Sequence, residues 1–204
     1  MTQINPEPIS VEETQEEPQP KPKLSLGHIL RSYLLLIILA GGIVLLDQIS
    51  KDWVRQNLMP YQSIAPIESL ENVFRIVHAQ NTGAAFGIFQ QGSLIFTALA
   101  IVVAVVIVYY YPQIHARDIP LRLALGLQLG GALGNLVDRL THGHVTDWIA
   151  VGDFPVFNVA DASITTGATV LILGVWMAER QVKKAKKLEE EQAELGDLEV
   201  GEQV

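Results

Sequence analysis

The sequence contains no cysteine, which excludes disulfide bonds, thiolate metal sites and a cysteine nucleophile. Basic residues are also too few to give an excess of positive charge, since the net charge is −8 and the isoelectric point about 5.1. Such a chain offers no surface that neutralises phosphates, so we expect no nucleic-acid partner. Residues 27–180 hold only ten acidic and eight basic side chains. This composition argues against a water-soluble globular enzyme and is typical of a membrane protein.

Most charges lie in two tails. Residues 1–26 are rich in proline, glutamate and glutamine and have no hydrophobic period, so we expect a disordered acidic tail. It is too acidic for the start of a cleaved signal peptide. Residues 181–204 form a second charged tail, in which residues 183–198 favour a solvated helix that frays. The predicted membrane domain is therefore residues 27–180.

Four apolar segments predict transmembrane helices at about residues 31–52, 93–112, 121–139 and 159–179. Ten Lys and Arg flank one side of these segments and four flank the other, which predicts that both termini are cytoplasmic. The first outer loop alternates loosely between residues 63 and 81, a pattern typical of short strands. The expected fold is an all-α membrane protein of four transmembrane helices with a small extracytoplasmic sheet.

The polar residues of the predicted spans gather at their outer ends. Each has an ordinary structural reading: Asp47 and Lys51 form an i,i+4 pair, and Asp138 beside Arg139 could be an interfacial ion pair. Scattered interfacial residues would not favour one side of the membrane in this way. The residues concerned are Asp47, Lys51, Asn135, Asp138, Arg139, Asp147, Asn158 and Asp161.

Two of these acids predict hydrolytic chemistry. Asn158 and Asp161 have the spacing of a capping box at the start of the fourth span. A cap needs no second acid, yet only 13 residues separate Asp147 from Asp161, which should place Asp147 near the same outer surface. Two carboxylates in a dry site share a proton, so one activates water while the other donates to the scissile carbonyl. We therefore expect an aspartic hydrolase at the outer face of the membrane.

Other readings are weaker. His142 and His144 with Asp147 suggest zinc, but the flexible glycine between them and the lack of a further ligand argue against it, so we expect no metal or cofactor. Glycines 126, 130 and 134 form a small-xxx-small stripe for close helix packing rather than a phosphate cradle. Residues 81–87 are either a plain turn or a loop that holds an extended peptide.

The runner-up function is a small transporter or channel subunit with a polar cluster at its outer end. A transport path needs polar groups through the depth of the bilayer, whereas these lie at one end. A non-catalytic scaffold would explain the glycine stripe but would leave the clustered acids without purpose, at a desolvation cost.

The motifs in their order resemble those of bacterial lipoprotein signal peptidase (signal peptidase II), over about residues 28–180. They are Asp47-Gln48-x-x-Lys51, Asn81-Thr82-Gly83-Ala84-Ala85-Phe86-Gly87, Gly134-Asn135-Leu136-Val137-Asp138-Arg139, Val145-Thr146-Asp147 and Phe157-Asn158-Val159-Ala160-Asp161. The chain departs from the family pattern at Thr146-Asp147-Trp148, where an apolar residue, Asp and Phe are more usual. Its connection from Asp147 to Asp161 is also short.

The resemblance implies an aspartic peptidase of the bacterial inner membrane, with an extracytoplasmic β-cradle at about residues 56–88. Its substrate would be a diacylglyceryl-modified prolipoprotein, cut just before the lipidated cysteine. Apart from the resemblance, we expect membrane lipids as partners and a monomeric enzyme. The catalytic pair would be Asp147 and Asp161. Asn81 and Arg139 would hold the substrate backbone, while Asn158 and Ala160 would position Asp161. The remaining supporting residues would be Asp47, Lys51, Gly83, Ala85, Asn135, Asp138 and Val145.

Overall fold

The computed structural model describes residues 26–83 and 92–201. Residues 1–25 of the predicted acidic tail and residues 84–87 of the predicted peptide-holding loop, Ala85 included, lie outside the described residues.

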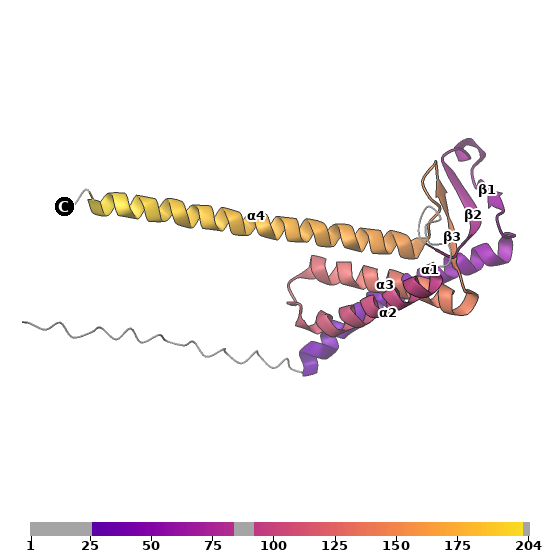
Figure 1. The fold of residues 1–204 in the computed structure, drawn as a ribbon, viewed down its shortest axis with the longest axis horizontal. Helices are drawn as coiled ribbons and strands as arrows, with labels where there is room; N and C mark the ends of the chain where they lie inside the picture. Colours follow the sequence, from indigo (N-terminus) through magenta and orange to yellow (C-terminus); the bar gives the residue numbers. More distant parts are fainter. Residues whose placement is uncertain (1–25, 84–91, 202–204) are drawn as a thin grey trace, which may run out of the picture.

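Four helices make up most of the described chain: α1 (Leu26–Asn57), α2 (Ser93–Tyr110), α3 (Ile119–His142) and α4 (Val159–Gly201). In Figure 1, α1, α2 and α3 lie together as a bundle, and α4 runs alongside α3 before projecting beyond it. Three stretches are long and apolar enough to cross a membrane: Tyr33–Asn57, Ser93–Gln113 and Val159–Leu188. The expected span 121–139 lies in α3, which is not among them and which buries Arg122, Asn135 and Asp138.

Glycines allow α3 to pack closely between its neighbours. A Cβ added at Gly126 would lie 2.6 Å from Cδ2 of Leu39, and one at Gly130 would lie 2.9 Å from the carbonyl oxygen of Ala40, both on α1. On another face of α3, a Cβ at Gly131 would collide with the carbonyl oxygen of Ala160 on α4. The predicted small-xxx-small stripe is therefore confirmed as a helix-packing surface.

A three-stranded antiparallel sheet, β1 (Ser63–Ile64), β2 (Phe74–Asn81) and β3 (Val145–Val151), lies at one end of the bundle, which we call the sheet end (Figure 1). The first two strands fall within the predicted range 56–88. The third was missed by the sequence patterns, which left its residues as a connection. β3 pairs with β2 in the register Ala79↔Asp147 and Asn81↔Val145, so the sheet holds Asp147 beside the end of β2.

The fourth predicted span ends at residue 179, but α4 continues as one helix to Gly201. It thus includes the segment 183–198 that was expected to be helical. Side chains of residues 181–188 are exposed, as expected for a charged helix that has left the bundle.

Candidate active site

Asp147 on β3 and Asp161 in the first turn of α4 line one cavity of about 510 Å³ at the sheet end. Its walls come from the end of β2, the turns of α2 and α3 nearest the sheet, β3 and the residues after it, and the start of α4. Several other predicted site residues line the same cavity: Asn81, Gly83, Asn135, Arg139 and Val145. The fold thus gathers into one hollow residues that are far apart in the sequence.

Asp147 is held by two amides and is almost completely buried, with 3% of its surface exposed. Asn81 Nδ2 donates to its Oδ2 at 2.8 Å, and Asn158 Nδ2 donates to its Oδ1 at 2.6 Å. Burial raises the pKa of Asp147 to about 7, and the negative charge of Asp161 adds to this rise, while the two amide hydrogen bonds oppose it. Asp147 therefore retains a proton near neutral pH for part of the time.

Asp161 is half-buried and held by the predicted capping box. Its N–H donates to Asn158 Oδ1 at 2.9 Å, and the Asn158 N–H donates back to Asp161 Oδ2 at 3.2 Å. Asn135 Nδ2 adds a bond to Asp161 Oδ1 at 2.8 Å. The cap and the second acid therefore coexist, and Asn158 contacts both carboxylates.

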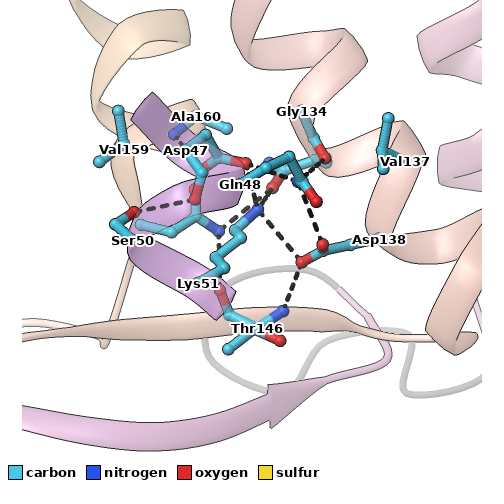
Figure 2. Close-up of polar contacts among 12 residues, drawn as sticks. Asp47, Gln48, Ser50, Lys51, Gly134, Val137, Asp138, Thr146, Val159 and Ala160 are labelled. Atoms are coloured by element: carbon cyan, nitrogen blue, oxygen red, sulfur yellow. Dashed lines mark hydrogen bonds and ion pairs between the residues drawn. The ribbon is translucent and has the colours of Figure 1, made fainter. Parts of the chain in front are cut away.

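A buried ion cluster supports this pair from the α1 side (Figure 2). Lys51 Nζ lies 2.7 Å from Asp47 Oδ2, 3.2 Å from Asp138 Oδ2 and 2.9 Å from Asn135 Oδ1. The two acids and the lysine are each 0% exposed. Because a buried charge is costly unless paired and hydrogen-bonded, this cluster constrains the helices to one arrangement. It also fixes the Asn135 amide, whose nitrogen points to Asp161.

Asp47 and Asp138 connect the cluster to the two elements that carry the acids. Asp47 Oδ1 accepts the N–H of Ala160, the residue before Asp161, at 3.0 Å. Asp138 Oδ2 accepts the N–H of Thr146, the residue before Asp147, at 2.9 Å. Figure 2 shows Asp138 reaching from α3 to both Gln48 and Thr146. Asp138 does not line the cavity, and its contacts are with these neighbouring groups.

Sequence reasoning assigned no role to Gln48, Arg55, Thr146 or the aromatic side chains of the cavity. Gln48 and Thr146 lay inside quoted motifs, so their position could have pointed to them. Phe96 packs under the guanidinium of Arg139, whose Cζ lies 5.5 Å from the ring centroid. Phe96, Arg139, Asn135 and Asp161 also line a second cavity of about 300 Å³ between α2, α3 and α4. Apolar side chains make up much of its remaining wall.

Within residues 26–83 and 92–201, no group of three or more His, Cys, Asp or Glu side chains is placed to hold a metal ion. The His142 and His144 rings lie 6.2 Å apart, and His142 Nδ1 lies 2.7 Å from the Thr141 hydroxyl. The described residues therefore offer no support for the zinc reading. The chemistry that the cavity can perform rests on two carboxylates, one of which has a pKa raised to about 7, with a guanidinium and amides beside them.

A membrane-helix bundle with two acids facing one cavity at its end defines the class of aspartic membrane hydrolases. The profile of the family described as Signal peptidase (SPase) II matches residues 39–177. Lipoprotein signal peptidase of Halothermothrix orenii is 38% identical over 148 residues, which are 72% of this chain and 97% of that protein. Lipoprotein signal peptidase of Pseudomonas syringae pv. tomato is 39% identical over 165 residues, which are 76% of this chain and 91% of that protein.

A solved structure described as a bacterial membrane enzyme superposes with a TM-score of 0.65 at 29% identity, covering 70% of this chain and 87% of that one. The chain belongs to the signal peptidase II family, and it is a membrane peptidase of the aspartic type. The transporter alternative is not favoured by these relatives.

Proposed function

We propose that this enzyme removes the signal peptide from diacylglyceryl-modified prolipoproteins by cutting just before the lipidated cysteine, with Asp147 and Asp161 as its catalytic residues. The observation that carries the assignment is the shared cavity, in which a buried Asp147 with a raised pKa faces a better hydrated Asp161. Different environments for two nearby acids are what separates a proton donor from a proton acceptor.

In this mechanism Asp161, at the positive end of the α4 dipole, is the ionised base. It takes a proton from water as the water oxygen attacks the scissile carbonyl carbon. Protonated Asp147 gives its proton to the carbonyl oxygen, which forms a neutral tetrahedral diol. The diol then loses a proton to the ionised Asp147 and collapses, while the proton held by Asp161 passes to the leaving nitrogen as the C–N bond breaks. Asn81 and Arg139 lie in the same cavity and would hold the substrate backbone.

The apolar second cavity supports a lipidated substrate. It shares Phe96, Asn135, Arg139 and Asp161 with the first cavity and extends between α2, α3 and α4 along the helices, away from the sheet. A substrate that enters sideways keeps its acyl chains in hydrocarbon while its scissile bond reaches the acids. Burial of Asp147 strengthens the electrostatic interaction within the pair, because charges interact more strongly away from water.

We propose further that α3 is the fourth transmembrane helix and that both termini are cytoplasmic. α3 follows the far end of α2 and leads into β3 at the sheet end, so it returns across the same thickness that α2 has crossed (Figure 1). Its 24 residues are long enough for this. Since the Lys and Arg excess lies at the end opposite the sheet, the active site would face the extracytoplasmic side, and residues 27–180 would form the peptidase domain of a monomeric enzyme.

The deciding experiment compares cleavage of a diacylglyceryl-modified prolipoprotein by purified wild type, Asp147→Asn and Asp161→Asn in detergent, followed by gel shift. We expect both variants to lose at least about 10²-fold in rate, since each removes a general acid or base. Asp138→Asn should retain some activity, and Asp153→Asn, an exposed acid just after β3, should match wild type.

Each variant is first checked for folding by its melting curve. Full activity in Asp147→Asn would remove that residue from the pair. Efficient cleavage of the same precursor without its lipid would contradict the proposed substrate class.

A further inference from the structure

Thr146 lies directly before Asp147 on β3, is 0% exposed and does not line the cavity. Its hydroxyl oxygen accepts a hydrogen bond from Arg55 Nη1 on α1 at 3.0 Å, across 91 residues of sequence. Arg55 also stays outside the cavity, and its side chain is only 14% exposed. The two residues form a contact on the face of β3 opposite Asp147, because adjacent side chains in a strand point to opposite faces.

Thr146 is held from three elements. Besides the bond from Arg55, its N–H donates to Asp138 Oδ2 on α3 at 2.9 Å, and its carbonyl oxygen accepts Asn158 Nδ2 at the start of α4, 3.4 Å away. That same amide nitrogen donates to Asp147 Oδ1. The backbone from which Asp147 projects is thus fixed against α1, α3 and α4 together.

Arg55 closes this arrangement into a ring. Its Nη1 lies 3.2 Å from Asp138 Oδ1 as well as 3.0 Å from the Thr146 hydroxyl, while its Nη2 binds Asp52 Oδ1 at the surface. Asp138 therefore accepts from Arg55 through one oxygen and from the Thr146 backbone through the other. A rotation of Thr146 away from Arg55 would also turn Asp147 away from Asn81 and Asn158.

We propose that Arg55 and the hydroxyl of Thr146 act as a positioning clamp, which holds Asp147 in its orientation toward Asp161 from behind the strand. Neither residue lines the cavity. The inference rests on the proposed role of Asp147 in catalysis, although the clamp itself is a feature of the fold.

The test compares Thr146→Val with Thr146→Ser. Valine keeps the shape of threonine but cannot accept the Arg55 hydrogen bond, whereas serine can. We expect Thr146→Val to lower kcat by about tenfold or more with little change in KM, because a small displacement of a catalytic group slows the chemical step. We expect Thr146→Ser to keep kcat within about threefold of wild type, because serine still accepts the Arg55 hydrogen bond and Asp147 is not displaced. The pH at which the cleavage rate falls on the alkaline side of its profile should change in Thr146→Val and stay the same in Thr146→Ser.

A double-mutant cycle with Arg55→Met separates a clamp from two independent effects. If Arg55 and Thr146 act through this one contact, the double variant should lose no more kcat than the less active of the two single variants. Additive losses, or a Thr146→Val enzyme with wild-type kcat and pH profile, would overturn the proposal.

A readout without substrate keeps the clamp apart from the proposed function. The pH dependence of the melting temperature, measured against Asp147→Asn in the same background, reports the titration of Asp147. In Thr146→Val that titration should shift, and in Thr146→Ser it should not. If Thr146→Val shifts the titration of Asp147 but the wild-type enzyme does not cleave the precursor, the proposed function is refuted and the clamp is supported. If the titration of Asp147 is unchanged in Thr146→Val, the clamp is refuted.

Discussion

At the scale of single residues, the two acids of the cavity differ in what surrounds them. Asp147 is nearly inaccessible and accepts from two neutral amides, and within residues 26–83 and 92–201 it forms no ion pair. Asp161 is half-buried and lies at a helix N-terminus, where the dipole favours negative charge. A proton shared between them is therefore better placed on Asp147, which assigns the acid and base roles of the proposed mechanism.

The raised pKa of Asp147 has a consequence for stability. Its carboxyl titrates near 7 in the folded protein and near its ordinary value of 3.8 when unfolded, so the folded state binds more protons between these values. Stability of wild type relative to Asp147→Asn should therefore fall as the pH rises from about 4 to 7, by roughly 1.4 kcal/mol per pH unit at most, and level off above 8.

Melting temperatures of both proteins in one detergent, taken from pH 5 to 8.5, measure this difference. Asp153→Asn serves as the control, because it replaces an exposed acid outside the cavity. A wild-type curve parallel to that of Asp147→Asn at every pH would show that Asp147 titrates at its ordinary pKa.

At the scale of secondary-structure elements, the contact between α3 and α4 determines where Asp161 lies. α4 approaches α3 so closely that glycine is required on both sides of the interface. A Cβ at Gly131 would meet the backbone at Ala160, and one at Gly167 would lie 2.6 Å from the carbonyl oxygen of Ala124. Since backbone atoms cannot yield as a flexible side chain does, this spacing is sensitive to one methyl group.

Gly167→Ala should therefore destabilise the enzyme by about 1–3 kcal/mol, as overpacking of a close interface does. Gly174→Ala is the matched control on the same helix, because a Cβ there meets nothing within 4 Å. We expect this variant to melt at or slightly above the wild-type temperature, since alanine favours helix over glycine. Equal melting temperatures for the two variants, measured by differential scanning fluorimetry in detergent, would contradict the close contact.

At the scale of the whole molecule, the sheet lies at one end of the bundle and the free half of α4 at the other (Figure 1). The proposed orientation places these ends on opposite sides of the membrane. Since the natural chain has no cysteine, single cysteines can report each side without background.

We expect Met59→Cys, near the sheet and 76% exposed, to react with a membrane-impermeant maleimide on intact spheroplasts. Lys184→Cys, on the exposed part of α4, should react only after the membrane is permeabilised. Gel shifts of the labelled protein measure both. The reverse pattern would invert the topology, and labelling of both sites from outside would contradict a cytoplasmic C-terminus.

The sequence by itself determined the features that depend on the residues of a single segment. Apolar length and composition predicted the helices, the glycine spacing predicted a packing face, and the Asn158–Asp161 spacing predicted a capping box, which the structure contains. The predicted motifs also contained both acids of the cavity. Such patterns follow from helix geometry and from the energy of burying apolar surface, which act within a single segment.

Only the tertiary structure decided what depends on contacts between distant segments. In the sequence, the residues of β3 look like a short connection. They form a strand because β2 supplies their hydrogen-bonding partner, and the two contacting residues Asn81 and Asp147 are 66 positions apart. Likewise, Asp138 and Asp147 are both plausible acids in the sequence, and it is packing that buries Asp138 against Lys51 and leaves Asp147 facing the cavity. Strand pairing and charge burial depend on which neighbours the whole chain brings together, so no local pattern could settle them.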